Sequence, residues 1–477
     1  MKQKSLLNNI KYSIFTQMVC LITPLITAPY IARVFNAELI GDYSYVYANS
    51  SYFVLLESLG LVLYGTIKIA KIRDNIIEKS ILFWEIFWLK CILMILSSVL
   101  YCVFFISLGE KNLEQLYFLM LMNIFANGID TVWFLNALEE FKVTAIRTVV
   151  IRLVNVILII CFVNDVSDLL RYALITQATL LFSSIILLPL SFKQVVWIPI
   201  EELNMLKHIS KSMSYLVPGL VNIIFSSADK SILGGFSKIT YEVGVYEQAN
   251  KVSQMGIGLI SSISNVILPR SAYLFANVKK QDSANSFMMK TVNGAAFVSC
   301  SFVFEIFATA NQFIPAFFGD GYEKSVIILQ ILCINVLTAV MGNFIAHQCL
   351  IARNKQTEYN IAILIGATVN LILNVVLVNR YLSEGVAASS AFSGGIVLGL
   401  ILFYTNDILP LKNFAKMIWK YLFAGFFMIA SVCMLSVDCN IWLSLLGKTF
   451  LGFIVYIICL IFLRDNFVME VISRVKR

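Results

Sequence analysis

Charged residues are scarce in this sequence. Only 13% of its 477 residues are Asp, Glu, Lys or Arg, whereas 59% are hydrophobic. Soluble domains are about half apolar and about a quarter charged. With a mean hydropathy of +0.83, the chain could not cover a water-exposed surface with polar groups. The composition therefore excludes a soluble globular domain and predicts a polytopic membrane protein.

Histidine is also scarce, and cysteine lacks any paired spacing. The two histidines, His208 and His347, lie far apart in the chain. The ten cysteines are scattered singly, mostly inside apolar runs, which is typical of small buried hydrophobic residues rather than of disulfides or metal ligands. We therefore expect neither a metal site nor a cofactor.

Motifs of soluble enzymes are missing. The sequence contains no G-x-x-x-x-G-K-[ST] phosphate loop, no H-E-x-x-H and no nucleophile elbow. No large outer loop exists to carry paired catalytic carboxylates, since the largest loop, Ser191–Lys211, is expected on the cytoplasmic side. The first apolar stretch, Asn9–Ile31, exceeds signal-peptide length and has no small-residue cleavage site after it. These absences favour translocation over catalysis.

Long apolar runs fill most of the chain. A transmembrane helix needs about 20 mostly apolar residues, and fourteen runs meet that length, with both termini then on one side. Their centres lie near Leu21, Leu55, Ile95, Ile124, Val156, Leu181, Ile223, Gly258, Val298, Val336, Ala367, Gly395, Gly425 and Val455. With the termini cytoplasmic, 24 Lys and Arg fall on the inner side and 6 on the outer side. This positive-inside bias explains the net charge of +8 without nucleic acid.

The two halves of the chain resemble each other. Gly41-Asp-Tyr43 opens the second span and Gly244-Val-Tyr246 opens the eighth, and Val-Asn pairs recur at equal spacing in the fifth and eleventh. A shift of six spans predicts two bundles of the same orientation, related by an axis along the membrane normal, with a binding site between them near the midplane. The expected domains are an N-lobe (1–192, six spans), a cytoplasmic connector (193–212), a C-lobe (213–410, six spans), and two further spans with a cytoplasmic tail (411–477).

Polar residues recur at helical spacing on four spans. They are Tyr43, Tyr47, Ser50 and Glu57; Asn123, Asn127 and Asp130; Asn222, Ser226 and Asp229; and Glu247, Asn250, Lys251, Gln254 and Ser261. Such spacing places each set on one helix face, which should look inward because a charge facing lipid costs at least ~2.5–3.5 kcal/mol. Single Asn and Ser residues favour hydrogen bonding between helices.

The intramembrane cations favour a functional role. Arg147, Arg152, Lys230 and Lys251 outnumber the carboxylates that could reach all of them, which predicts a net-positive cavity for an anionic substrate. Lys90 and Lys448 have no polar stripe around them, so we expect snorkelling or packing there. Arg147 and Arg152 point about 140° apart on a helix, which suggests that only one of them faces the cavity.

Short motifs resemble those of the Wzx-like polysaccharide flippases, the O-antigen or capsule-repeat exporters of the multidrug/oligosaccharidyl-lipid/polysaccharide superfamily. The likeness covers about the first 275 residues. One departure is Asn136-Ala137, where such proteins often have Gln-Gly, a change that would alter local helix packing. The motifs are Asn9, Gln17, Pro24, Pro29-Tyr30, Arg33, Gly41 and Tyr43; Gly60-x-x-x-Tyr64-Gly65, Ala70 and Arg73-Asp74; Asp130-x-x-Trp133-Phe134, Glu139 and Lys142; Pro218, Asp229, Leu233-Gly234 and Phe236; and Gly244-x-Tyr246-x-x-Ala249-x-Lys251 with Pro269-Arg270.

The resemblance implies a substrate, a two-lobed alternating-access fold and a location in the bacterial inner membrane. The substrate would be an undecaprenyl-pyrophosphate-linked oligosaccharide, flipped from the cytoplasmic to the outer leaflet, with a glycan polymerase and a chain-length regulator as pathway partners. The expected substrate-binding residues are Arg147, Arg152, Lys251, Tyr43, Tyr47 and Asn250. Candidate carboxylates for ion or proton coupling are Asp229, Asp130, Glu57 and Glu247.

Three alternatives stay open from the sequence. A flippase for another lipid-linked precursor, such as the peptidoglycan unit, should show more cations in the first two spans than Arg33 alone. A drug/cation antiporter of the same superfamily would prefer a net-negative cavity. A glycan polymerase or ligase would need a sizeable outer loop with catalytic residues.

Overall fold

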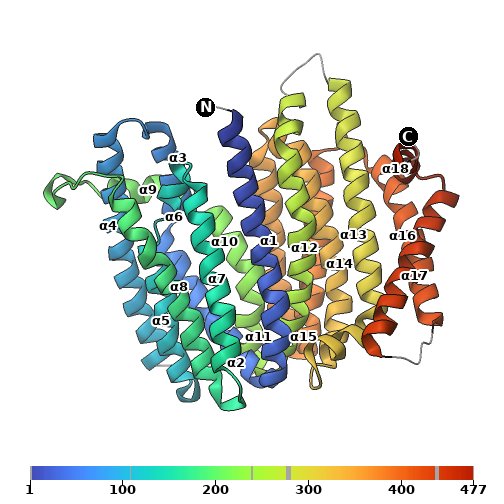
Figure 1. The fold of residues 1–477 in the computed structure, drawn as a ribbon, viewed down its shortest axis with the longest axis horizontal. Coiled ribbons are helices and arrows are strands. Elements are labelled where there is room, and N and C mark those ends of the chain that lie inside the picture. The colour runs from blue at the N-terminus through green and yellow to red at the C-terminus, as the bar shows by residue number, and fades with distance from the viewer. Residues whose placement is uncertain (1–2, 108, 238–239, 276–280, 436–439, 476–477) are drawn as a thin grey trace. The chain divides into compact units, whose positions relative to one another are not determined.

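The computed structural model describes residues 3–475 except 108, 238–239, 276–280 and 436–439. Across these residues the chain is helical and contains no strand (Figure 1). The helices form two compact units, residues 1–244 and 245–477, each with its own internal contacts. The predicted all-α polytopic fold class is confirmed.

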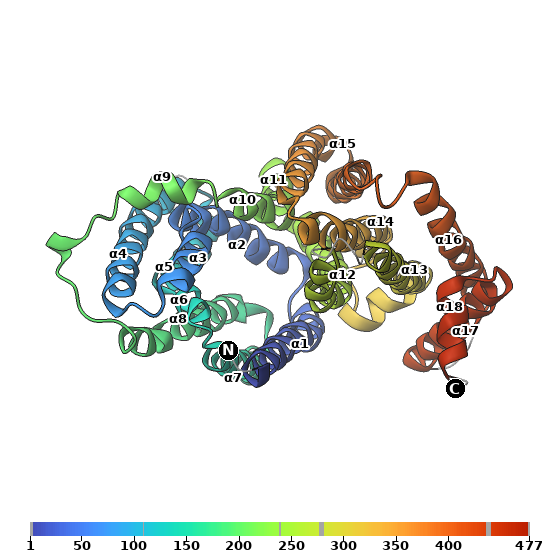
Figure 2. The same ribbon diagram turned by 90° about the horizontal axis from the view of Figure 1, so that it is seen from above.

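The first unit is built from eleven α-helices and the start of a twelfth. Seen from above, α1 and α7 lie next to each other (Figure 2), in agreement with their packing contacts. The helices are α1 (Gln3–Val34), α2 (Ala37–Ser58), α3 (Leu61–Ile72), α4 (Ile76–Tyr101), α5 (Glu114–Ile129), α6 (Val132–Ala137), α7 (Phe141–Phe162), α8 (Leu169–Phe192), α9 (Lys207–Met213), α10 (Val217–Ile223) and α11 (Asp229–Ser237), and α12 (Thr240–Phe275) begins here.

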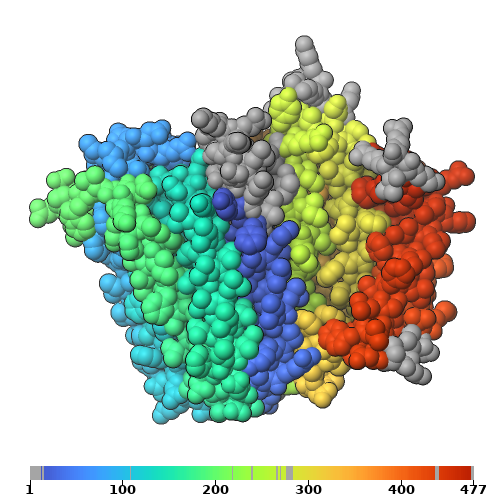
Figure 3. Space-filling view, in the orientation of Figure 1, coloured from blue at the N-terminus to red at the C-terminus, as the bar shows by residue number. Residues whose placement is uncertain are grey.

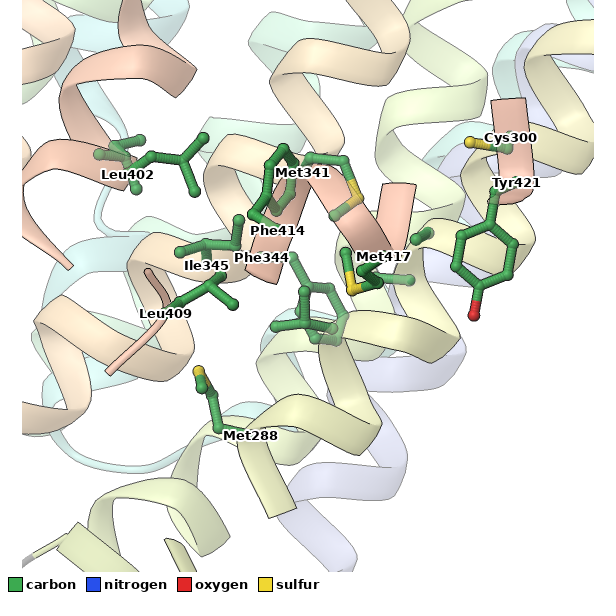
Figure 4. Packing of buried hydrophobic residues seen from close by; sticks show 14 of the residues in the cluster. Met288, Cys300, Met341, Phe344, Ile345, Leu402, Leu409, Phe414, Met417 and Tyr421 are labelled. Atoms are coloured by element: carbon green, nitrogen blue, oxygen red, sulfur yellow. The ribbon is translucent and has the colours of Figure 1, made fainter. Parts of the chain in front are cut away.

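The second unit contains the rest of α12 and six further helices. Its apolar core joins α13, α14, α15 and α16, where Met341, Phe344 and Met417 pack together (Figure 4). The helices are α13 (Gln281–Phe318), α14 (Lys324–Ile345), α15 (Gln356–Tyr404), α16 (Leu411–Met434), α17 (Ile441–Phe462) and α18 (Asn466–Val475).

Eleven of the described helical segments are long and apolar enough to cross a membrane. One of them, α15, holds two of the expected spans, because Leu382 interrupts it with a φ of 48°. The expected spans near Ile223 and Gly258 fall on α10–α11 and on α12. A π-helical turn, Ile224–Ala228, divides the first into short pieces, and polar residues lower the hydropathy of the second. The count of fourteen stays a prediction.

Two membrane helices of the first unit are broken in mid-course. Between α2 and α3, Leu59 and Gly60 both adopt positive φ (37° and 77°), and a Cβ on Gly60 would lie 2.8 Å from the backbone of Tyr215, so glycine is required there. Between α5 and α6, Asp130 is extended and caps the next turn, because its Oδ1 accepts from the Val132 N–H at 3.1 Å. Each break exposes backbone groups that need partners.

The segment after α8 is fastened to α4. The Trp84 indole donates to the Val196 carbonyl at 2.9 Å, and the Val196 N–H donates to the Ser80 hydroxyl at 2.9 Å. Glu85 then accepts from the Asn204 N–H at 2.9 Å. The expected connector is therefore held along the helical bundle. The predicted end of the N-lobe stays a prediction. A repeat defines a lobe by its equivalent helices, whereas the two compact units are defined by contacts.

The outer faces of α7 and α8 are apolar. These helices run side by side down the face shown in Figure 3. The exposed residues of α7 include Ile146, Val150, Leu153 and Ile157, and an apolar stripe of this kind suits contact with lipid. The same helix contributes Arg147, Thr148, Arg152 and Asn155 to the cavity described next.

Candidate substrate cavity

A polar cavity of about 310 Å³ lies inside the first unit, among α1, α2, α7 and α8. Its volume is at the lower end of the roughly 300–1,000 Å³ of ligand pockets. Two arginines line it, and none of the described lining residues is acidic. The lining residues are Thr23, Tyr43, Tyr47, Arg147, Thr148, Ile151, Arg152, Asn155, Thr176, Gln177, Thr179, Leu180 and Ser183.

Arg147 presents a buried donor that has no partner. One of its terminal nitrogens donates to the Ser183 hydroxyl, while its Nε is buried without a hydrogen-bond partner among the described residues. Buried donors are almost always paired in native proteins, so this guanidinium N–H on the cavity wall is available to an acceptor. Arginine suits a phosphate acceptor because its planar fork of donors matches phosphate oxygens.

Arg152 lines the same cavity. The expectation that only one of the two arginines faces the substrate stays a prediction. The helix directions differ by about 140°, and Arg147 is half-buried whereas Arg152 is exposed. The lining of the cavity thus includes two cations from one helix.

Aromatic and hydrogen-bonding groups from α2, α7 and α8 complete the lining. The rings of Tyr43 and Tyr47 stack with centroids 6.2 Å apart and planes at 14°. The Gln177 amide donates to the Tyr43 hydroxyl at 3.1 Å, and its Oε1 has no partner among the described residues. The Asn155 amide donates to the Thr179 hydroxyl at 2.8 Å. Rings flanked by amides and hydroxyls can bind a sugar.

The sequence prediction missed the contribution of α8. Thr176, Gln177, Thr179 and Ser183 line the cavity from this helix. Three of them, at positions 176, 179 and 183, recur at i, i+3 and i+7, which places them on one face. This spacing of hydroxyl residues inside an apolar span was the sequence signal for a polar helix face. None of the three residues is charged, so the signal is weaker than that of the arginines.

A buried charged cluster lies at the break between α5 and α6. Lys90 of α4 is buried, and its ammonium donates to the carbonyls of Asn127 (2.9 Å) and Asp130 (3.1 Å). Of the two roles expected for Lys90, packing is therefore right and snorkelling is wrong. Glu57 is 1% exposed and within electrostatic reach of Lys90 and Asp130. Its Oε2 has no hydrogen-bond partner among the described residues.

Hydrogen bonding between helices is confirmed for one predicted stripe. The Asn123 amide of α5 donates to the Ser50 hydroxyl of α2 at 2.9 Å. Asn127 in turn donates to the Asn123 side chain at 3.1 Å. Both residues are engaged in packing rather than directed into the cavity.

Asp229 and Lys230 begin α11 in the first unit, and both are buried and have partners. Helix α11 packs against α2, and the two charges lie within electrostatic reach of Tyr52 on that helix. Their roles in transport stay predictions.

The remaining candidates lie on α12 in the second unit. The Lys251 ammonium is 3.8 Å from the Glu247 carboxylate one turn away, and Asn250 accepts a 3.5 Å hydrogen bond from Gln254. The structure thus brings together four of the six predicted substrate-binding residues, Tyr43, Tyr47, Arg147 and Arg152. Lys251 and Asn250 are not among the residues that line this cavity.

The fold and the cavity define the class of the protein, a multipass membrane protein with a transporter fold. The chain is similar to a solved structure titled "Lipid II flippase MurJ, inward closed conformation", with a TM-score of 0.72, 17% identity, and 96% of this chain and 99% of that chain covered. It is also similar to an inward-facing multidrug resistance MATE family transporter of the MOP superfamily, with a TM-score of 0.57, 14% identity, and 83% and 95% covered.

Residues 6–275 match the polysaccharide biosynthesis protein family, and the chain belongs to it. One relative, from Escherichia coli (strain K12), is named "Putative O-antigen transporter" and is 22% identical over 84% of this chain and 97% of its own length. Another, "Capsular polysaccharide biosynthesis protein CapF" of Staphylococcus aureus, is 21% identical over 64% of this chain and 78% of its own. The named transporters and flippases confirm the predicted class, which is not that of an enzyme.

Proposed function

We propose that this protein flips an undecaprenyl-pyrophosphate-linked oligosaccharide, an O-antigen or capsule repeat unit, from the cytoplasmic to the outer leaflet by alternating access. The observation that carries the proposal is the cavity with two arginines and no acidic residue among those that line it. The relatives named for O-antigen transport and capsular polysaccharide biosynthesis support the same substrate class.

The chemistry of the substrate matches the cavity. A pyrophosphate carries at least two negative charges, which the two arginines can balance in a low-dielectric site. The unpaired Nε of Arg147 is a donor for one of its oxygens. The stacked Tyr43 and Tyr47 with Gln177 suit the first sugar, while the prenyl tail stays in lipid between helices.

Membrane orientation and energy supply follow from the same proposal. The protein lies in the bacterial cytoplasmic membrane with both termini cytoplasmic, as the positive-inside bias indicates. An ion or proton gradient drives the cycle, with Glu57 and Asp130 beside Lys90 as the best-placed coupling groups and Asp229 and Glu247 as further candidates. A glycan polymerase and a chain-length regulator use the exported unit.

A second candidate function is the flipping of a peptidoglycan precursor. The TM-score of 0.72 with the Lipid II flippase MurJ favours it. A drug/cation antiporter is disfavoured, because a cation would be repelled by the arginines of the cavity. A polymerase or ligase is disfavoured by the short loops of the sequence.

Export of surface glycan in a flippase-null strain, normalised to membrane protein level, tests the proposal. Arg147→Ala should lose most of the export, because removing one partner of a desolvated charge pair costs ~2–5 kcal/mol, about a 30- to several-thousand-fold loss in affinity. Arg152→Ala should reduce the export less, because this side chain is exposed. Arg152→Lys should retain much of the export, since positive charge matters more than side-chain identity.

Lys448→Ala is the matched control, because this cation lies on α17, outside the cavity, and its loss should be tolerated. Near-normal export from every alanine variant would remove the anion-cavity proposal. Rescue of cells depleted of their Lipid II flippase, without rescue of the glycan-export strain, would favour the second function.

A further inference from the structure

The second unit contains another cavity, of about 590 Å³, that transport does not account for. Helices α12, α13, α14 and α18 form it. Its walls are mainly apolar, and its charged residues are Arg270, Lys290 and Glu470. The lining residues are Ile260, Ile263, Ile267, Arg270, Phe287, Lys290, Thr291, Gly294, Ala295, Val298, Phe344, Phe467, Glu470 and Val471.

The charges gather at one end of this cavity. Helices α12 and α13 run antiparallel side by side (Figures 1 and 2), so Arg270 on α12 lies over the Phe287 ring on α13, 4.6 Å from its centroid. Ile260 and Val298 lie about 15 Å further along their helices, at a rise of 1.5 Å per residue. The cavity is therefore amphipathic along its length, with a cationic end and an apolar end.

The described lining of the cationic end has more cations than carboxylates. The Lys290 ammonium lies 2.9 Å from the Glu470 carboxylate, whereas the ion pairs among the described residues give Arg270 no carboxylate. Two cations and one carboxylate leave one positive charge. A phosphodiester carries one negative charge, whereas a pyrophosphate carries more and suits the two arginines and acid-free lining of the first unit.

The wall contributed by α18 is fixed in place. Asp465 Oδ1 accepts from the N–H groups of Phe467 (3.0 Å) and Val468 (3.1 Å), and from the Tyr421 hydroxyl of α16 at 3.2 Å. This N-terminal cap holds the short helix against the bundle. Phe467 and Glu470 of this helix therefore line the cavity from a fixed position.

We propose that this cavity binds an anionic glycerophospholipid of the membrane. The phosphodiester lies between Arg270 and Lys290, and an acyl chain follows Ile267, Ile263 and Val298. The positive-inside bias places this end of α12 and α13 at the cytoplasmic leaflet, where anionic lipids attract cations of the protein. The bound lipid joins α18 to the α12–α13 pair.

Lipid binding to the purified full-length protein in detergent, followed by native mass spectrometry, tests the inference. Phosphatidylglycerol should bind more tightly than zwitterionic phosphatidylcholine. Arg270→Gln should weaken phosphatidylglycerol binding about fivefold, the effect of one interfacial cation, and Arg270→Lys should retain it. Val298→Trp, which fills the apolar end, should weaken both lipids.

Arg380→Gln is the matched control, because Arg380 also lies over an aromatic ring, that of Tyr381, yet is not among the residues that line the cavity. Its lipid binding should equal that of the wild type. Equal binding of the two lipids, or unchanged binding by Arg270→Gln with a wild-type unfolding temperature, would overturn the inference. So would displacement of phosphatidylglycerol by undecaprenyl phosphate at lower concentration, which would assign the cavity to the substrate path. Equal binding of the two lipids, or unchanged binding by Arg270→Gln, would leave the glycan-export proposal standing, because that proposal rests on the cavity of the first unit.

Discussion

At the residue scale, the cluster at the α5–α6 break contains charged residues with two different roles, one structural (Lys90) and one suited to proton exchange (Glu57). Lys90 is balanced by backbone carbonyls at a helix C-terminus, where the dipole favours a cation. Glu57 Oε2, by contrast, has no hydrogen-bond partner among the described residues, so a proton gained or lost there breaks no hydrogen bond. This freedom makes Glu57 a better coupling candidate than a carboxylate locked in an ion pair.

Glu57→Gln should abolish glycan export while membrane abundance stays near normal, because Gln keeps the shape of the side chain but cannot exchange a proton. Glu57→Asp keeps the carboxylate and should retain part of the export. The measurement is surface glycan in the flippase-null strain, normalised to protein. Wild-type export from Glu57→Gln would exclude Glu57 from coupling, and a parallel loss of protein would assign it a structural role.

Sequence alone could predict Arg147 and Arg152 because a charge in a membrane span must find a polar environment. It offered only the spacing of the α8 hydroxyls, which by itself does not separate a cavity wall from hydrogen bonding between helices. The role of Lys90 was also beyond the sequence. The carbonyls that accept from Lys90 lack intrahelical partners only because α5 breaks at Asp130.

At the element scale, the segment after α8 depends on a buried hydrogen-bond chain. Glu85 of α4 accepts from Lys207 Nζ at 2.6 Å and from His208 Nε2 at 2.8 Å, and the Tyr64 hydroxyl of α3 is 2.9 Å from His208 Nδ1. With Nε2 donating to Glu85, a neutral His208 accepts the Tyr64 proton at Nδ1. Burial lowers the pKa of His208 below its usual value, an effect that outweighs the opposing influence of Glu85.

Acid should therefore loosen this segment. Since the folded-state pKa of His208 is lower than the unfolded one, protonation favours unfolding; the stability is fully present above about pH 6.5 and declines as the pH falls through the folded-state pKa. The unfolding temperature of the wild type in detergent should fall more between pH 7.5 and pH 5.5 than that of His208→Gln, which keeps a donor for Glu85 but does not titrate. An equal or smaller fall in the wild type would contradict the assignment.

At the scale of the whole molecule, the fold class was predictable because length and apolarity decide whether a helix can cross a membrane. The helix breaks were not, since Leu59 and Leu382 adopt positive φ through their tertiary surroundings and carry no turn signal of their own. Residues 238 and 279, whose lysines entered the predicted orientation, lie outside the described residues.

Orientation itself can be checked on described positions. Single cysteines placed in a cysteine-free variant at Arg73 and Arg353 should react with an impermeant maleimide only after the membrane is opened, whereas one at Lys111 should react in intact cells. The physical reason is the excess of cations on the cytoplasmic side. Labelling of Arg353 from outside would reverse the topology of the second unit.

The charges around the first-unit cavity also give the protein an electrical property. Arg147 and Arg152 give the cavity lining two positive charges, and none of the described lining residues is acidic. Moving one elementary charge across the whole membrane is worth about 2.3 kcal/mol per 100 mV. An inside-negative potential therefore draws the empty cavity toward the cytoplasmic face, whereas a bound pyrophosphate with two negative charges cancels the charge that moves. In the proposed alternating-access cycle, voltage would favour return of the empty carrier and would act little on the loaded one.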